Sequence, residues 1–449
     1  MGDKKFSSKI GFILSAAGSA VGLGNLWRFP YLAAKYGGGT FLLIYLILTV
    51  TFGFSMMLTE IAIGRKTGKS ILGAYGALNK KFKFIGYLSG LVPVIIFPYY
   101  CVIGGWVLKY MTTFLAGESQ KAVSADYFTG FITGTAQPVV FLFVFLAATA
   151  VIVVFGVQKG IEKANKIMMP ALIIMTVLVA VYGLTVPGAL DGLVYYLKPD
   201  FGKFSFNAVA AAAGQLFYSL SLAMGIMVTY GSYMKKEDNI ETCVKQIEIF
   251  DTGVAFLAGL IIIPAIFTFG EKKEAILTSG PSLMFITLPK VFSNMRLGWL
   301  VGAVFFVLVF FAALTSSISL METIVAMVEE KTGWKRVTAC IITGLFSFAL
   351  ALPSALGFGA LSGVNIIGMS FLDFFDFISN SVLMPIVALL MCIFVGYVLK
   401  TDAIAEEISE SESFKRRKLY DVIIKYVAPV FLVIILITSI LSSFKIISL

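Results

Sequence analysis

The stretch AAGSAVGLGNLWRFP (residues 16–30) lies in the first apolar run of the chain and determines how the other runs are interpreted. It contains Gly18, Gly22 and Gly24, and it continues with Asn25 and Arg28, none of which a simple membrane anchor needs. Irregular backbone at membrane depth is tolerated only where protein or a water-filled cavity satisfies its polar groups. The stretch therefore predicts a membrane helix that is broken at a binding site. Close packing of helices through small residues is the alternative.

The composition is that of a helical membrane protein. Of the 449 residues, 59% are hydrophobic and only 13% are charged, and the mean hydropathy is +0.94. A soluble chain of this length would need more charged residues to cover its surface. The sequence has no His, the commonest metal ligand and neutral-pH proton switch. Its four cysteines stand singly in apolar runs, which indicates packing rather than a redox or metal role.

Hydropathy and helix-stop signals predict eleven membrane spans. They lie near residues 10–36, 40–64, 84–114, 139–156, 161–184, 206–233, 241–269, 296–328, 336–352, 371–399 and 421–443. Most of the 35 Lys and Arg residues fall in alternate connecting segments. This pattern predicts a cytoplasmic amino terminus and an outer carboxyl terminus in a plasma membrane or bacterial inner membrane. It also explains the net charge of +10 without nucleic-acid binding.

A second interrupted span supports the interpretation of the first. The run AGQLFYSLSLAMGIMVTYGSY (213–233) carries Ser219, Ser221 and Gly225 among apolar residues. Interrupted spans at corresponding positions of two five-span halves indicate an inverted-repeat transporter with its substrate site between them. We therefore predict an all-α polytopic fold with a 5+5 inverted repeat, broken helices 1 and 6, and one extra carboxyl-terminal helix. Its parts would be a tail (1–9), a first repeat (10–184), a second repeat (206–399), a solvated polar connector (400–420), and span 11 with a short outer tail (421–449).

Polar groups in two further spans indicate a cation site. Thr315 and Ser316 place hydroxyls in span 8, and Asp251 places a carboxylate in span 7, which has no nearby basic residue to neutralise it. Hydroxyls and free carbonyls are hard oxygen ligands, and a carboxylate inside the membrane needs a compensating charge. An alkali cation would meet both conditions. Back-bonding of the hydroxyls to the preceding helical turn is the alternative.

Arg28 is a second charged side chain inside a predicted span, on the outer side of the site. A charged side chain so deep in a span needs an anionic neighbour. Asp373 and Asp376 begin span 10 in FLDFFDF (371–377). An Arg–Asp pair above the site would act as an outer gate, and a snorkelling Arg without a specific partner is the alternative.

These motifs resemble the neurotransmitter:sodium symporter family, and the match follows nearly the whole chain in order. The matching strings are GSAVGLGNLWRFP (18–30), GGGTFLLIY (37–45), GQLFYSLSLAMG (214–225), TYGSY (229–233) and LTSS (314–317). The resemblance implies a symporter, not an enzyme, that imports a neutral α-amino acid with Na⁺ by alternating access. Its other partner would be the lipid bilayer, and its oligomeric state stays open.

The resemblance implies two sodium sites. The first would use the Ala20 carbonyl and the side chains of Asn25, Ser219 and Asp251. The second would use the carbonyls of Gly18, Val21 and Ala312 with the hydroxyls of Thr315 and Ser316. Many relatives have Asn where Asp251 stands and bind chloride nearby. An acidic residue supplies that negative charge itself, so we expect transport without chloride.

The resemblance also places the substrate. Its carboxylate would meet the Gly22 and Gly24 amides and the Tyr100 hydroxyl, and its amine would meet unwound carbonyls and Ser221. Monoamine carriers of the family have an acidic residue at the position of Gly22. The whole substrate set would be Ala20, Gly22, Gly24, Ile96, Tyr100, Tyr218, Ser219, Ser221, Ala223, Met224, Ser317 and Leu320. Because this set holds no charged side chain, a neutral amino acid fits best. Ala223 stands where relatives frequently have Gly and takes up room in the pocket, so a small to medium side chain is expected.

Gating residues follow from the resemblance as well. Arg28–Asp376 would close the outer side above Tyr100 and Tyr218.

On the inner side, Glu330 matches the acidic member of the family's latch, but the tail offers Lys4 and Lys5 instead of Arg. Lys cannot make the bidentate fork of Arg, so the latch would be looser. In related carriers the spacing between Gly160 and Pro170 lets the inner half of span 5 unwind. A helix start followed by an ordinary kink is the alternative.

Three other functions are alternatives to the symporter. An ion channel would not need two asymmetric broken helices and a gating Arg. An intramembrane protease would need Asp251 beside Asp373 or Asp376, but Asp251 lies in mid-span and the other two at an outer helix end. A sensor would bind an amino acid without moving it, and only transport against a gradient separates it from a symporter.

Overall fold

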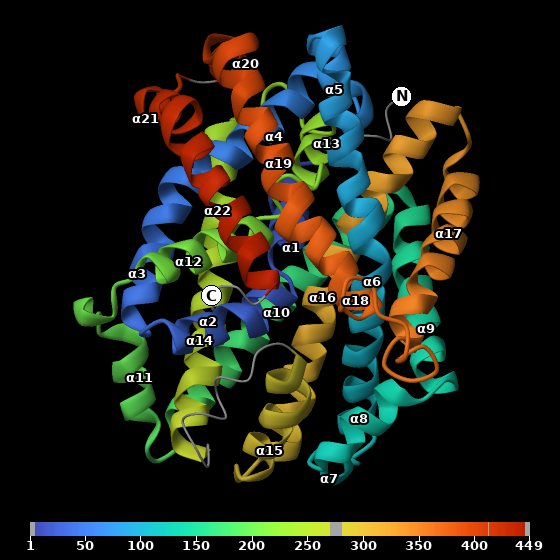
Figure 1. Cartoon of the computed structure of the whole chain (residues 1–449), viewed down its shortest axis with the longest axis vertical. Coiled ribbons are helices and arrows are strands. Elements are labelled where there is room, and N and C mark those ends of the chain that lie inside the picture. Colours follow the sequence, from blue (N-terminus) through green and yellow to red (C-terminus); the bar gives the residue numbers. More distant parts are fainter. Residues whose placement is uncertain (1–4, 270–280, 412, 445–449) are drawn as a thin grey trace.

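The computed structural model describes residues 5–269, 281–411 and 413–444, and every named element in them is helical (Figure 1). The α-helices of the first half are α1 (Lys9–Ala20), α2 (Phe29–Lys35), α3 (Gly39–Leu48), α4 (Phe54–Thr67), α5 (Ile71–Leu78), α6 (Lys83–Leu115), α7 (Ser119–Ala122), α8 (Ala125–Thr133), α9 (Ala136–Val154), α10 (Lys163–Leu184) and α11 (Ala189–Leu197). Those of the second half are α12 (Phe206–Ser219), α13 (Ile226–Ser232), α14 (Ile240–Phe269), α15 (Leu288–Ser293), α16 (Gly298–Thr332), α17 (Arg336–Leu356), α18 (Phe371–Asp376), α19 (Met384–Ile393), α20 (Thr401–Ser409), α21 (Arg417–Val422) and α22 (Ala428–Ser443).

Shorter turns continue several of these helices. The π-helical turns are η2 (Gly24–Arg28), η3 (Thr49–Gly53), η5 (Val157–Glu162), η8 (Leu283–Thr287), η9 (Phe377–Leu383), η10 (Phe394–Val398) and η11 (Ile423–Val427). Two 3₁₀ turns, η4 (Lys80–Phe82) and η6 (Phe201–Lys203), precede α6 and α12.

The membrane spans agree with the hydropathy pattern. Within the described residues, nine continuous helices are long and apolar enough to cross a membrane, and the bent pair Lys9–Ala20 and Gly24–Lys35 would be a tenth. The expected sixth span is divided between α12 and α13, each of which is too short to cross alone. The all-α polytopic fold is therefore confirmed, and the count of eleven spans stays a prediction.

Both predicted breaks are present. The chain bends by 54° between α1 and η2, where Val21 is extended. Between α12 and α13, Ser221 and Ala223 have φ values of 53° and 60°, a left-handed backbone that residues with a Cβ rarely adopt. The Ala223 amide donates to Oε1 of the buried Glu60 (2.6 Å), which holds this strained segment in place.

The broken helices lie at the centre of the molecule. In Figure 1, α1 lies at the centre, where it packs against α10, α14 and α16, with α9 and α17 on one flank and α3, α11 and α12 on the other. The first half of broken span 1 thus lies among long, continuous helices, and α13, the second half of broken span 6, packs against α4. These neighbours can satisfy the backbone groups that the breaks expose.

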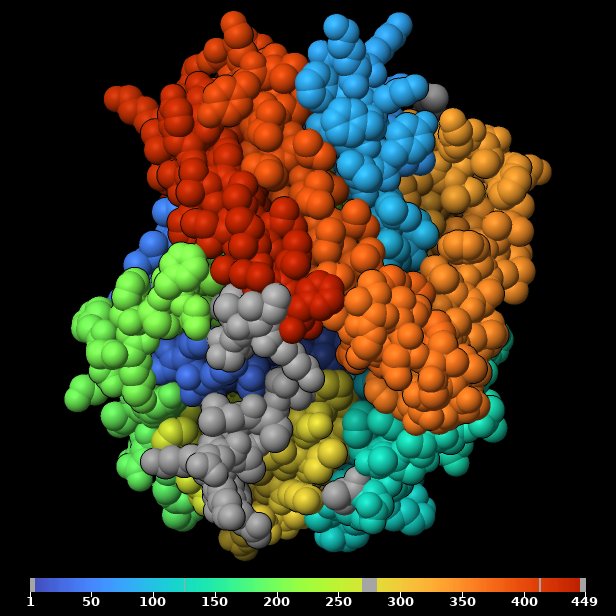
Figure 2. Space-filling model, viewed as in Figure 1, coloured from blue at the N-terminus to red at the C-terminus, as the bar shows by residue number. Residues whose placement is uncertain are grey.

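The connecting segments divide between two ends of the molecule. α20 and α21 (orange-red to red) and α5 (blue) lie at one end, and α7 and α8 (cyan) lie at the opposite end (Figures 1 and 2). α5 and α20, which lie in segments that the charge pattern assigns to the inner side, are both at the first end.

The connector at 400–420 packs against the bundle, contrary to the solvated segment that its polar sequence suggests. In α20, Ile404 and Ile408 are fully buried, and Glu407 is 1% exposed. Glu407 Oε1 lies 2.7 Å from Arg65 Nε and 2.8 Å from Lys236 Nζ. Burial alone would lower the pKa of Lys236, but the carboxylates of Glu407 and Glu410 raise it overall. The apolar residues are spaced for one helical face, and the buried acid is paired.

We expect Arg65→Ala to lower the free energy of unfolding by about 3–5 kcal/mol, because it leaves the Glu407 carboxylate buried with only Lys236 beside it. Thermal unfolding of the purified protein measures the change. Lys66→Ala removes the same charge one residue away and should have little effect. A double variant with Glu407→Ala should recover stability, and an unchanged melting temperature for Arg65→Ala would contradict the role of the pair.

Candidate functional site

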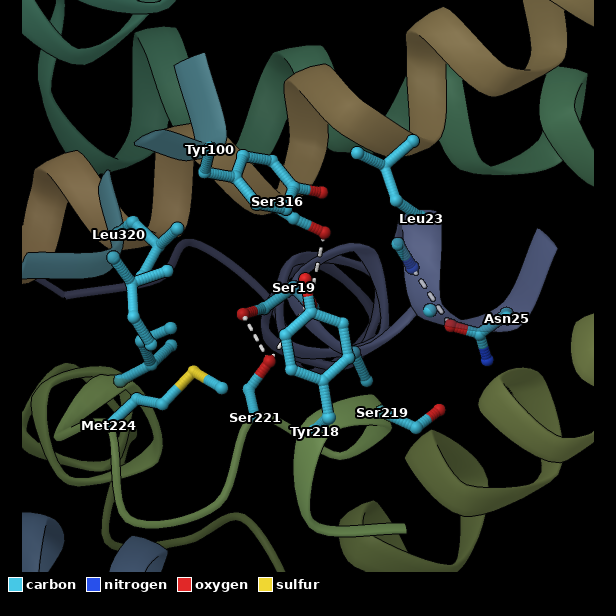
Figure 3. Close-up of a pocket in the computed structure, with 15 residues that line it drawn as sticks. Ser19, Leu23, Asn25, Tyr100, Tyr218, Ser219, Ser221, Met224, Ser316 and Leu320 are labelled. Carbon is cyan, nitrogen blue, oxygen red and sulfur yellow. Dashed lines mark hydrogen bonds between the residues drawn. The ribbon is translucent and has the colours of Figure 1, made fainter. Parts of the chain in front are cut away.

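A small pocket lies between the two breaks (Figure 3). Its volume is about 30 Å³, which is room for water but not for an amino acid. It is lined by Ser19, Ala20, Gly22, Leu23, Gly24, Asn25, Ile96, Tyr100, Tyr218, Ser219, Ser221, Met224, Ile226, Ser316 and Leu320. A larger occupant therefore requires the walls to move outward.

One wall of the pocket is suited to an anion. The Tyr100 hydroxyl is buried and has no hydrogen-bond partner among the described residues. A Cβ added to Gly22 would lie 3.3 Å from this hydroxyl, and one added to Gly24 would lie 2.7 Å from the Tyr218 ring. Both glycines thus allow the backbone to approach the pocket closely. The Gly22 amide donates to Asn25 Oδ1 (3.0 Å) in this arrangement. Amides at the start of a helical turn such as η2 favour negative charge.

A cluster of hydrogen bonds around Asp251 adjoins this wall. Its Oδ1 accepts from Asn25 Nδ2 and Ser219 Oγ, each at 2.8 Å, and its Oδ2 accepts from Tyr45 Oη at 3.2 Å. Asp251 is fully buried, and no basic side chain of the described residues pairs with it. A carboxylate held only by neutral donors is a suitable place for a cation. Tyr45, which ends the GGGTFLLIY string, was not among the predicted ligands.

A second oxygen-rich cluster lies where α16 meets the break in span 1. Ser316 Oγ is within hydrogen-bond distance of three carbonyl oxygens, those of Gly18 (3.4 Å), Ser19 (3.1 Å) and Val21 (3.3 Å). Thr315 Oγ1 instead donates to Phe311 (3.0 Å) and Ala312 (3.1 Å) in its own helix. The structure thus brings the five predicted residues of this set together, and Thr315 adopts the back-bonded arrangement.

The predicted substrate residues line the pocket, except two. Ser317 Oγ bonds to Thr149 Oγ1 (2.7 Å) and faces α9, and the Ala223 amide faces Glu60. Ser221 Oγ donates to the Ser19 carbonyl at 3.0 Å (Figure 3). The lining residues that the sequence did not single out are Ser19, Leu23 and Ile226.

The predicted outer gate lines a separate cavity of about 280 Å³. Arg28 and Asp376 both face it, but no ion pair within 4.0 Å joins them in the described structure. The Arg28 guanidinium lies 5.7 Å from the centre of the Tyr218 ring. Asp376 Oδ1 accepts from Tyr99 Oη (3.2 Å) and Asn380 Nδ2 (2.5 Å).

The predicted inner latch has a different arrangement in the part of the chain that the structure describes. Glu330 Oε2 accepts from the Ser70 amide (2.6 Å) at the start of α5. The Lys5 carbonyl accepts from Gln158 Nε2 (2.8 Å). Lys4 lies outside the described residues.

The tail is instead joined to span 5 through Glu162, which is 1% exposed. Glu162 Oε2 accepts from the Ser7 amide (2.7 Å), and Oε1 accepts from the hydroxyls of Ser7 (2.5 Å) and Ser8 (3.0 Å). Lys166 Nζ lies 2.7 Å from Oε1. These contacts fall within the Gly160–Pro170 segment, so the tail holds the part of span 5 that the resemblance expects to unwind. Sequence gave no signal for this pairing.

We expect Glu162→Ala to raise the rate of tryptic cleavage after Lys9 by about 10- to 100-fold. The tail loses hydrogen bonds to a charged group, each worth about 1.5–3 kcal/mol, and opens more often. Cleavage of the purified protein, followed by mass spectrometry, measures the rate. Lys166→Ala keeps the serine contacts and should change it little. Equal rates for the two variants would contradict the latch.

The pocket, its two oxygen clusters and the two broken spans occur in a chain that matches a known family. Residues 3–127 and 128–447 match the model of the Sodium:neurotransmitter symporter family. The chain belongs to this family.

Proteins with similar sequences are described as sodium-dependent transporters. The sodium-dependent transporter YhdH of Bacillus subtilis (strain 168) is 34% identical over 438 residues, which is 96% of each chain. A sodium-dependent transporter of Methanocaldococcus jannaschii is 31% identical over 96% of this chain and 89% of its own. The crystal structure of MhsT in complex with L-phenylalanine has a TM-score of 0.87 and 36% identity, covering 97% of this chain and 99% of that one.

Family membership settles the class of function. This chain is a multi-pass membrane protein of a sodium-dependent transporter family and is not an enzyme. The intramembrane protease alternative is thereby excluded.

Proposed function

We propose that the protein is a sodium-coupled symporter that imports a neutral α-amino acid by alternating access. The observation that carries the proposal is the small pocket in which the unpartnered Tyr100 hydroxyl and the glycine backbone of span 1 meet Asn25 and Ser219, both of which hydrogen-bond to Asp251. A substrate carboxylate fits the first two, and a cation fits the third. The bound phenylalanine of the MhsT structure supports an amino acid as substrate.

Two sodium ions would be bound by the two oxygen clusters. The first would be held by the Ala20 carbonyl, Asn25, Ser219 and Asp251, and the substrate carboxylate would complete its shell. The second would be held between α1 and α16 by Gly18, Val21, Ala312, Thr315 and Ser316. A shared ligand makes the binding of sodium and of substrate mutually favourable, which is the physical basis of coupling.

Asp251 would make chloride unnecessary. A fixed carboxylate beside the first sodium ion supplies the negative charge that a neutral residue would have to take from a bound anion. The burial of Asp251 and its three neutral donors support this role.

The side-chain part of the pocket would select a neutral amino acid. Ile96, Met224 and Leu320 line it, and a charged substrate side chain would be buried there without a partner. Met is flexible and can adapt to occupants of different size.

Uptake into proteoliposomes tests the proposal, with a panel of labelled neutral amino acids, an inward sodium gradient, and gluconate replacing chloride. We expect at least one of them to accumulate above its equilibrium level only when the gradient is present. Binding without accumulation would favour a sensor, and sodium entry without any amino acid would favour a channel. We further propose that the amino terminus is cytoplasmic, which protease protection of the tail in oriented vesicles would check.

A further inference from the structure

A groove that shares no lining residue with the substrate pocket crosses the lipid-facing surface of spans 2 and 7. Its volume is about 490 Å³, larger than that of the substrate pocket or of the outer cavity. Residues of α3, η3 and α14 form its walls, and Arg416 from the connector lies at one end. Nothing in the proposed transport cycle uses this groove.

The walls of the groove are mainly apolar and exposed. Val50 is 47% exposed and Ile249 is 69% exposed, as expected for side chains that face lipid. On α14 the groove runs from Lys245 to Phe256, which at 1.5 Å per residue is about 16 Å. That length accommodates much of one acyl chain.

One end of the groove is cationic. Arg416 is half-buried, and its guanidinium has no hydrogen bond or ion pair within 4.0 Å in the described structure, although it lies 4.9 Å from the centre of the Phe54 ring. Its position is fixed through Glu241, whose Oε2 accepts from the Lys415 amide (3.0 Å) and whose Oε1 lies 2.7 Å from Lys245 Nζ. A half-buried guanidinium with free donors is suited to a phosphate.

Glu248 adds an acceptor to the same groove. Its side chain is 5% exposed, and its Oε1 is buried without a hydrogen-bond partner among the described residues. Because it forms no ion pair with Arg416, the guanidinium donors remain available. The unpaired oxygen can accept a hydrogen bond from a hydroxyl of a lipid headgroup.

We propose that this groove binds an anionic glycerophospholipid from the leaflet on the side of the 400–420 connector. The phosphate lies against Arg416 and Lys245, and one acyl chain follows the apolar wall toward Phe256. Charge complementarity selects this occupant, since basic pockets between membrane helices bind anionic headgroups. A zwitterionic lipid such as phosphatidylcholine carries a choline cation beside its phosphate, so its net attraction to Arg416 and Lys245 is weaker than that of an anionic lipid.

Native mass spectrometry of the purified full chain tests the site, with dioleoyl phosphatidylglycerol and dioleoyl phosphatidylcholine as probes. We expect one phosphatidylglycerol to bind about tenfold more tightly than phosphatidylcholine, and Arg416→Gln to lose that difference. Arg417→Gln is the matched control. It removes the same charge from the next residue, which pairs with Asp402 instead of lining the groove.

A second pair of variants tests the acyl-chain part. A Cβ added to Gly253, in the wall of the groove, meets nothing within 4 Å, and the same is true of Gly183 in α10 outside it. Gly253→Leu should weaken the binding of both lipids, and Gly183→Leu should weaken neither. The proposal is overturned if wild type binds the two lipids equally, or if Arg416→Gln and Arg417→Gln bind phosphatidylglycerol equally. A dimer that Gly253→Leu dissociates without changing lipid binding would overturn it too.

Discussion

We expect Asp251→Asn to abolish sodium-driven uptake in chloride-free medium, and we expect added chloride to restore part of that uptake. The substitution keeps the size of the side chain but removes the one formal charge from the cluster of Asn25, Ser219 and Tyr45. Without this counter-charge, the binding free energy of the sodium ion weakens by about 3–5 kcal/mol, which corresponds to at least about a 100-fold fall in its affinity. Chloride bound beside the cluster would return the missing charge. Initial uptake rates, measured with gluconate and with chloride, give both effects.

Glu248→Gln is the matched control for this experiment. It makes the same chemical change in the same helix, one turn away, at a carboxyl group that faces the groove rather than the substrate pocket. Its uptake should stay close to that of wild type in both media. If Asp251→Asn kept its full rate without chloride, Asp251 could not be the built-in negative charge.

The two breaks could be predicted because they depend on local chemistry. Glycines and hydroxyl residues inside apolar runs weaken a helix wherever they stand, so residues 16–30 and 213–233 revealed the centre of the molecule. The substrate pocket followed from the same strings, since most of its lining residues are in or beside the breaks. The family resemblance then assigned roles that composition alone could not.

Contacts between distant segments could not be predicted in the same way. Residues 41–48 are apolar on every side of the helix apart from the Tyr45 hydroxyl, so nothing in the sequence says that this hydroxyl turns toward Asp251 rather than toward another span. Ser8 looks like an ordinary helix cap, which it also is, but its hydroxyl meets Glu162 across 154 residues of sequence. The direction of a side chain around its helix, and the helix that it meets, are set by packing.

The connector at 400–420 shows a second limit of prediction from sequence. Residues 400–420 are rich in charge, and polarity alone indicates a solvated segment. Ile404 and Ile408 are buried because one face of α20 packs against the bundle. That packing depends on Arg65 and Lys236, which come from distant parts of the sequence and pair with Glu407 on α20. Ion pairing offsets the desolvation cost of burying the Glu407 carboxylate, so this polar segment can pack against the helix bundle.

Tyr100→Phe should raise the KM for the amino acid by about 10- to 100-fold. The substitution removes only the buried hydroxyl that has no partner of its own and that faces the backbone of Gly22. A hydrogen bond from such a donor to a carboxylate is worth about 1.5–3 kcal/mol, because the site excludes water that could replace it. The ring remains, so the apolar wall of the pocket is kept. Uptake rates over a range of substrate concentrations, at saturating sodium, give the change.

Tyr110→Phe is the control, because its hydroxyl is also buried but donates to the Phe285 carbonyl (2.7 Å), and neither residue lines the substrate pocket. That variant should show lower thermal stability with little change in KM. A methyl ester of the preferred amino acid separates the carboxylate contact from a general effect on the pocket. The ester lacks the negative charge, so it should bind wild type and Tyr100→Phe about equally, whereas the free acid should distinguish them. If ester and acid lost affinity together, the hydroxyl would be shaping the pocket rather than binding the carboxylate, and the α-amino acid assignment would lose its main contact.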